Sequence, residues 1–219
     1  MKLYTESSST VKNTFTLNIE LSVVFVLSFL LMINPVQAQD ERYYDEDVWA
    51  PLLDSLKTVN KNKVSESGDR VELAANIALL YYPKLKTNRI KIKYKKNVQH
   101  PITASWSFWN IFKIRRWHTY VLLIKPNSFI DRISLNKQVG LVGHEMAHFA
   151  YYKKRPSIAM AWWGLKYVTS RKFRYAFERG ADQTAIDQGL GWQLLDMSIY
   201  MRRFEVQQYM RQSGKYQSQ

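Results

Sequence analysis

The stretch LVGHEMAHFAYYKKR, residues 141–155, places His144 and His148 four residues apart, with Glu145 directly after the first histidine. Apolar residues around it recur at the spacing of one helical face, which predicts a helix from 135 to 152. On a helix, residues four apart lie on one face, about 6 Å apart along the axis. Two imidazoles placed in this way can bind a single metal ion.

Glu145 completes an H-E-x-x-H pattern, which suggests a chemical role for the helix. Glu145 lies about 100° around the helix from His144, so its carboxylate would stand beside a bound ion and could reach a metal-bound water. Zinc lowers the pKa of such a water towards ~7, and a neighbouring carboxylate can take its proton as it attacks a carbonyl. The pattern predicts a zinc-dependent hydrolase with Glu145 as the general base.

A catalytic zinc site of this kind needs a third protein ligand. The chain has no cysteine, and no histidine follows His148. A helix expected at 172–188 carries Glu178 and Asp182, again four residues apart and therefore on one face. One carboxylate can bind the ion while the other accepts an N–H from a ligand histidine and fixes its tautomer. The alternative is a solvated acidic pair on a surface helix.

H-E-x-x-H followed by E-x-x-x-D on a later helix resembles the gluzincin zinc peptidases. HEMAHFAYY and FERGADQTAIDQGL are most similar to the CAAX prenyl endopeptidase group and its small soluble relatives, the minigluzincins. The resemblance implies that His144, His148 and Glu178 bind Zn²⁺ and that Asp182 orients His144. It also implies a zincin-like core of a small sheet and about three helices, with an edge strand at 117–125 that holds an extended peptide.

The other periodicities predict an α+β fold with a small, mostly antiparallel sheet packed on the two motif-bearing helices. Residues 89–95, RIKIKYK, alternate strictly and predict a half-buried strand, and 117–126 predict another, with a loosely alternating segment between them. Helices are expected at 48–59, 70–82, 135–152, 157–168, 172–188 and 192–211. The expected organisation is a lead-in and short helix at 39–69, a zincin-like metallopeptidase domain at 70–212 and a polar tail at 213–219.

The N-terminal region has the pattern of a targeting segment. Residues 21–33 are apolar apart from two serines, and the following NPVQA suits a signal peptidase. As a helix this run would rise about 20 Å, which is short for a bilayer core of ~30 Å. We therefore expect a signal peptide at 1–38 and an exported protein, periplasmic or secreted, that begins at Gln39. Because the charges before the apolar run cancel, a membrane tether formed by 21–33 is the alternative.

The formal net charge of +14 lies wholly after residue 38. The expected partners are a peptide or protein substrate and an anionic envelope polymer or membrane surface, and nucleic acid is less favoured for an exported protein. The absence of cysteine excludes disulfides and thiolate metal ligands. The alternative function is a non-catalytic exported envelope protein that binds an anionic partner through its basic surface.

Some side chains have two interpretations. Tyr200, Arg202 and Arg203 are candidates for stabilising an oxyanion by position, but an ordinary basic helix is the favoured interpretation. His118 is expected to be a strand histidine without a catalytic role. The aromatic residues at 106–109 and 157–168 are interpreted as core, with a membrane-facing or substrate-gating rim as the alternative.

Overall fold

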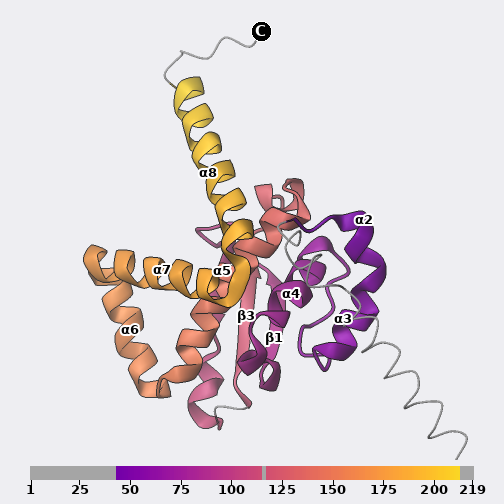
Figure 1. Ribbon diagram of the computed structural model, residues 1–219. Coiled ribbons are helices and arrows are strands. Elements are labelled where there is room, and N and C mark those ends of the chain that lie inside the picture. Colours follow the sequence, from indigo (N-terminus) through magenta and orange to yellow (C-terminus); the bar gives the residue numbers. More distant parts are fainter. Residues whose placement is uncertain (1–42, 115–116, 213–219) are drawn as a thin grey trace, which may run out of the picture. The chain divides into compact units, whose positions relative to one another are not determined.

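The computed structural model describes residues 43–114 and 117–212. In this part of the chain, helices cover one face of a three-stranded sheet, which confirms the predicted α+β class (Figure 1). The expected signal peptide or tether and the polar tail lie outside the described residues. None of the described helices has both the length and the apolar character needed to cross a bilayer.

The elements follow the predicted helix boundaries to within a few residues. In order they are α2 (Glu46–Trp49), η2 (Ala50–Leu52), α3 (Leu53–Val59), α4 (Arg70–Leu80), η3 (Pro83–Thr87), β1 (Arg89–Tyr94), β2 (Ile102–Trp106), η4 (Phe108–Phe112), β3 (Thr119–Ile124), η6 (Phe129–Arg132), α5 (Leu135–Lys154), α6 (Ser157–Thr169), α7 (Arg171–Ala185), η7 (Ile186–Leu190) and α8 (Gly191–Gln212).

The sheet has the strand order β1-β3-β2 and is mixed. β2 and β3 are antiparallel, with Ala104 opposite Leu122, whereas β1 and β3 are parallel, with Ile92 opposite the same Leu122. The prediction of a mostly antiparallel sheet is therefore wrong for the β1–β3 pair. The prediction assumed that the segment between β1 and β3 is a simple connection of antiparallel strands. This segment instead contains β2, which lies on the other side of β3 from β1.

The expected position of the edge strand is also wrong, because 117–125 contains the central strand β3. β3 reads TYVLLI and is apolar on both faces, so flanking strands on both sides remove its backbone from water. The edge strand beside the motif helix is β2. Pro101 accepts a bond from the Lys125 N–H, so Ile102, Ala104 and Trp106 direct their backbone groups away from β3.

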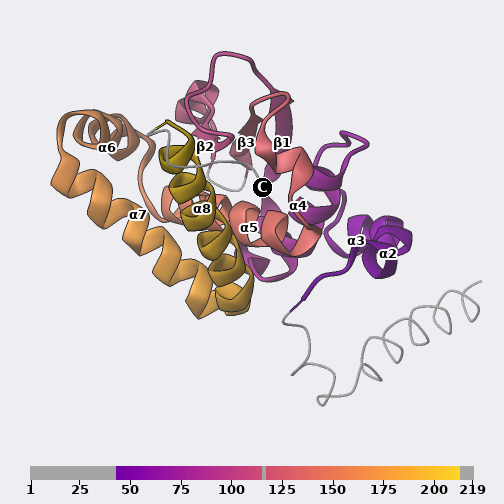
Figure 2. The ribbon, with the colours of Figure 1, turned by 90° about the horizontal axis from the view of Figure 1, so that it is seen from above.

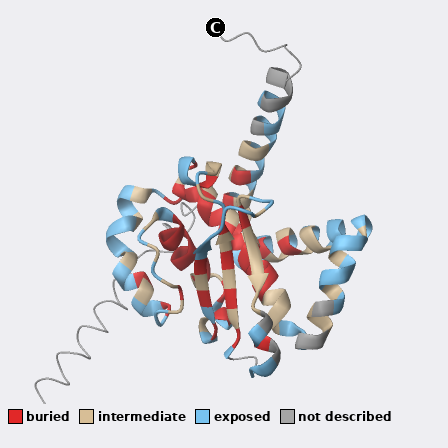
Figure 3. Ribbon diagram, turned by 180° about the vertical axis from the view of Figure 1, so that it is seen from behind, coloured by how far each residue is buried: buried red, intermediate tan, exposed pale blue. Residues whose placement is uncertain are grey.

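The core lies between the inner face of the sheet and helices α4 and α5. Every residue of α4 from Val71 to Leu79 is buried, and α5 buries Val139, Val142 and Met146. Across the layers, the rings of Tyr120 in β3 and Phe149 in α5 stack with centroids 4.9 Å apart and an angle of 14°. Figure 3 shows the strands from behind, and along β1 and β3 the core-facing positions are coloured as buried and alternate with more exposed ones.

Helices α7 and α8 both lie against α5 (Figure 2). A Cβ atom at Gly140 in α5 would stand 2.3 Å from the backbone oxygen of Gln193, so only glycine allows α8 to approach this closely. Gly189 has a φ of 96° between the two later helices, a conformation that glycine adopts without steric cost. These two glycines let the chain reverse after α7 and return across α5.

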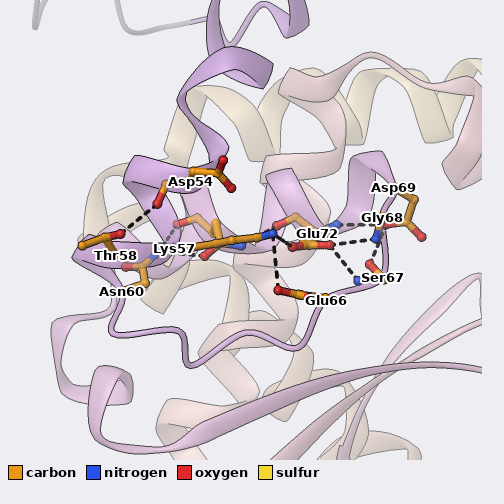
Figure 4. A network of polar contacts seen from close by, with 10 residues as sticks. Asp54, Lys57, Thr58, Asn60, Glu66, Ser67, Gly68, Asp69 and Glu72 are labelled. Atoms are coloured by element: carbon orange, nitrogen blue, oxygen red, sulfur yellow. Dashed lines mark hydrogen bonds and ion pairs between the residues drawn. The ribbon is translucent and has the colours of Figure 1, made fainter.

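The buried carboxylate of Glu72 binds backbone groups at the N-terminus of α4 (Figure 4). Glu72 accepts backbone N–H bonds from Ser67 and Gly68 at 2.7 and 2.8 Å, and it forms a 2.8 Å ion pair with Lys57 of α3. Asp69 in turn caps the helix by accepting the N–H of Glu72. Burial alone would raise the pKa of Glu72, but these hydrogen bonds and the charge of Lys57 outweigh it and hold the pKa below the ordinary 4.5.

The Glu72→Gln substitution should lower the free energy of unfolding at neutral pH by about 1–3 kcal/mol, since it removes the charge from a buried, hydrogen-bonded group. The folded-state pKa of Glu72 is depressed, so its contribution is present above the unfolded-state pKa and is lost as the pH falls through the folded-state pKa. Urea denaturation of both proteins should therefore show a difference at pH 7 that shrinks below about pH 4.5.

Glu66→Gln is the matched control, because Glu66 is 85% exposed and lies 3.9 Å from the same lysine. It should change stability by less than about 0.5 kcal/mol. Equal effects of the two substitutions would show that the buried position of Glu72 is irrelevant.

Candidate metal centre

The two motif histidines lie on one side of α5, at its middle. Buried apolar residues on the opposite side hold the helix against α4 and the sheet, and Lys153 and Lys154 in the last turn complement the negative end of the helix dipole. The imidazole centroids of His144 and His148 are 4.8 Å apart. His148 is buried and His144 is half-buried, so both rings have limited contact with water.

Helix α7 places its two carboxylates against these rings. Ser170 is the N-cap of the helix, since its hydroxyl accepts the N–H of Phe173, and the four-residue spacing puts Glu178 and Asp182 on the face towards α5. Glu178 Oε2 lies 3.1 Å from His144 Nε2 and 3.3 Å from His148 Nε2. One ligand atom from each of these three residues lies within 4.8 Å of the other two, the arrangement of a metal-binding group.

Asp182 lies behind His144 as seen from this cluster. Its Oδ1 is 2.8 Å from His144 Nδ1, so the Nδ1–H donates to the carboxylate. This bond leaves the lone pair on Nε2 when the ring is neutral, and Nε2 is the nitrogen that faces Glu178. Asp182 therefore fixes the tautomer that a metal ligand requires.

The cluster carries more negative than positive charge unless a cation is added. Burial opposes a charge on His144, but the hydrogen bonds to Asp182 and Glu178 outweigh burial and raise its pKa to about 10. Burial would raise the pKa of Glu178, and its contacts with both histidines and a tyrosine hold it well below the usual range instead. The site is thus arranged to hold positive charge, either as protons or as a metal ion.

Glu145 lies at the junction of α5 and the edge strand β2. Its Oε2 accepts the backbone N–H of Ala104 at 2.5 Å, and its side chain is buried. Burial raises the pKa of Glu145 above its ordinary value, more than the two histidines and the Ala104 N–H lower it. A carboxylate with raised basicity therefore stands beside the three candidate ligands and touches the strand edge.

Tyr167 contacts the cluster but was not among the site residues predicted from the sequence. This residue of α6 donates its hydroxyl hydrogen to Glu178 Oε1 at 2.6 Å, so it holds the carboxylate oxygen that does not face the histidines. Burial and the carboxylate raise the pKa of Tyr167, so the phenol keeps its proton and remains a donor. No local pattern links Tyr167 to Glu178, because the contact depends on how α6 folds back on α7.

Aromatic side chains from α6 and α7 pack beside the cluster. Phe177 of α7, next to Glu178, stacks on His148 with centroids 4.7 Å apart, and Trp163 and Tyr167 of α6 contact the Phe177 ring edge-on. These contacts fix the ring plane of His148 and the position of α7 at Glu178.

A cavity of about 1000 Å³ opens beside the cluster. Its walls include β2, the aromatic side of α6 and the first turns of α8, and all three candidate ligands and Glu145 line it. The lining is mainly aromatic and aliphatic, with polar side chains such as Thr103, Arg174 and Arg202 among them. Such a cavity can receive a ligand at the metal-binding group.

The other candidates lie elsewhere or at the rim. His118 is buried, with Nε2 3.1 Å from the carbonyl oxygen of Lys113, and is not part of the cluster. Arg202 lines the cavity, Tyr200 packs its ring against Phe129, and Arg203 is exposed. The expected catalytic and metal residues thus lie together, and of the three oxyanion candidates only Arg202 lines the cavity.

Comparison of the chain with protein-family models, with characterised proteins and with solved structures found no match.

The Tyr167→Phe substitution should weaken zinc binding about tenfold to a hundredfold, because the hydroxyl orients the Glu178 carboxylate and outer hydrogen bonds of this kind carry that much affinity. Competition with a chromogenic chelator measures the affinity. The Co²⁺-substituted protein should also lose intensity in its visible absorption, since the released Oε1 becomes free to join Oε2 in binding the ion.

Tyr175→Phe is the control, because Tyr175 is exposed on α7. It should leave both the affinity and the cobalt spectrum unchanged. An unchanged affinity and spectrum in Tyr167→Phe would remove Tyr167 from any role at the centre.

Proposed function

We propose that this chain is a zinc-dependent metallopeptidase of the gluzincin type, which hydrolyses peptide bonds with Glu145 as general base. The observation that carries the proposal is the convergence of His144 Nε2, His148 Nε2 and Glu178 Oε2 at the end of an open cavity, with Asp182 behind His144.

The donor set supports zinc over harder cations. Two imidazoles and one carboxylate form a ligand set that zinc uses in catalytic sites, whereas magnesium and calcium prefer oxygen ligands throughout. A structural zinc site would be closed by four protein ligands. Here three ligands adjoin a cavity of about 1000 Å³, which favours catalysis over the alternative of a non-catalytic binding protein.

The chain's own residues supply the rest of the chemistry. When bound, zinc would supply a Lewis acid and an activated water. His144, His148 and Glu178 would hold the ion. Glu145 would accept the proton of the attacking water and pass it to the leaving amine, a role that suits a carboxylate whose pKa is raised by burial.

The edge strand β2 suits an extended peptide as substrate. The backbone groups of Ile102, Ala104 and Trp106 point away from β3, and Ala104 contacts Glu145 directly. A peptide pairing with this edge would place a carbonyl near the general base. The apolar lining of the cavity would favour a large apolar side chain next to the cleaved bond.

The Glu145→Gln substitution should keep the bound zinc and lower peptide hydrolysis by at least about a hundredfold, because the amide cannot accept the proton. Digestion of a broad peptide library, followed by mass spectrometry, measures the loss. Cleavage at the parental rate would rule out the mechanism, and absence of cleavage by a zinc-loaded parent would favour the binding-protein alternative.

The Glu178→Ala substitution should lower the zinc content after dialysis to less than a tenth of the parent's, since it removes one of three ligands. Asp187→Ala is the matched control, as Asp187 is an exposed carboxylate just beyond the same helix. Equal zinc content in the two variants would exclude Glu178 as a ligand.

A further inference from the structure

A groove on the face of the sheet opposite the metal centre combines lysines with aromatic side chains. Along β1 and β3, alternate residues face away from the core, among them Lys91, Lys93 and Val121. Helix η4 lies beside this face, and the groove between them has a volume of about 510 Å³. We call the five charged and aromatic residues that line it the basic aromatic surface: Lys91, Lys93, Trp109, Phe112 and Lys113.

The segment that forms the sheet and η4 carries charge of one sign. From Leu73 to Ile130 the chain contains eleven lysines and arginines and neither aspartate nor glutamate. The net charge of the protein is therefore concentrated in the segment that forms the sheet and η4. A one-signed field of this kind attracts an anionic partner and is weakened by salt.

The same surface exposes large apolar side chains. Phe112 is 75% exposed and Trp109 is 68% exposed, and Ile114 and Trp117 beyond η4 are also more than half exposed. The rings of Trp109 and Phe112 lie 6.3 Å apart, so they form one apolar projection. Contiguous exposed apolar groups of this size typically mark an interaction site.

Helix α6, which η4 contacts, extends the apolar area. None of the described residues of α6 is buried, as its pale blue and tan colours in Figure 3 show. Trp162, Leu165 and Val168 are exposed, and Lys166 places its ammonium group 5.3 Å from the Trp162 ring. Val168 also lines the cavity at the metal centre, together with Trp163 and Tyr167 of the same helix, so α6 borders both regions.

We propose that the basic aromatic surface docks onto a lipid bilayer that contains anionic phospholipids. Trp109 and Phe112 enter the headgroup region, where aromatic rings are favoured, and Lys91, Lys93 and Lys113 contact the lipid phosphates. The docking is independent of metal and of peptide hydrolysis.

Exposed aliphatic side chains favour a bilayer over a single-stranded nucleic acid. Nucleic acids use exposed aromatic rings as stacking platforms, but they gain little from aliphatic groups. Ile114, two residues beyond Phe112, and Leu165, on the helix that contacts η4, are aliphatic and exposed, and a bilayer can bury such groups together with the rings.

Site-specific labelling tests the insertion in the full chain, which has no cysteine of its own. A Phe112→Cys variant carries an environment-sensitive dye and is titrated with vesicles of equal parts phosphatidylglycerol and phosphatidylcholine. We expect a blue shift of the emission and quenching by brominated lipids. A Tyr175→Cys variant, labelled in the same way at an exposed position of α7, should show neither change.

Charge removal tests the role of the lysines in the labelled protein. Lys91→Gln with Lys93→Gln should weaken vesicle binding about twenty-five-fold, since each lysine contributes about fivefold, and 0.5 M salt should weaken it further. The matched control removes two exposed charges elsewhere, Lys61→Gln with Arg203→Gln, and should have a clearly smaller effect.

Three outcomes would overturn the proposal. The first is an unshifted label at position 112, or equal shifts at 112 and 175, with these vesicles. The second is tight binding of single-stranded RNA through the same lysines without insertion into vesicles. The third is a label shift that depends on protein concentration in the absence of lipid, since it would mean that a second copy covers the surface.

Discussion

The crossing of α7 over α5 brings three carboxylates and two imidazoles into one partly buried place, and the charge balance there constrains the rest of the site. Glu145, Glu178 and Asp182 would repel each other without positive charge between them. In the absence of a metal, protonation of His144 supplies part of that charge, as its raised pKa indicates. A divalent ion among His144, His148 and Glu178 would supply more charge and engage all three ligands.

The packing around the crossing limits how far these groups can move. Phe177 is in contact with His148 and with aromatic residues of α6, so Glu178 beside it is held by ring contacts as well as by its own hydrogen bonds. One turn before His144 on the same face of α5, Gly140 allows α8 to lie against the helix. A candidate site held by contacts with both α6 and α8 is preorganised, which lowers the entropic cost of binding an ion.

The parts of the site that follow a local spacing could be predicted from the sequence, and the parts that depend on distant contacts could not. Helical periodicity was sufficient to place His144 and His148 on one face, and Glu178 and Asp182 on another. The contact of Tyr167 with Glu178 and the central position of β3 are set by packing between segments, for which a single sequence carries no pattern. The alternating lysines of β1 correctly predicted a strand. They did not show that η4 lies beside the exposed face of that strand, because this contact also depends on packing between distant segments.

The parallel pairing of β1 with β3 has a consequence for the order in which the molecule can fold. Arg89 pairs with Thr119, thirty residues later, and β2 must lie on the far side of β3 before the sheet is complete. Closing such loops costs entropy before any contact is gained, so formation of the sheet is slow compared with that of the helices. During synthesis β1 leaves the ribosome before its partner strand β3 has been made. The alternating lysines of β1 keep the unpaired strand soluble and discourage its pairing with other chains.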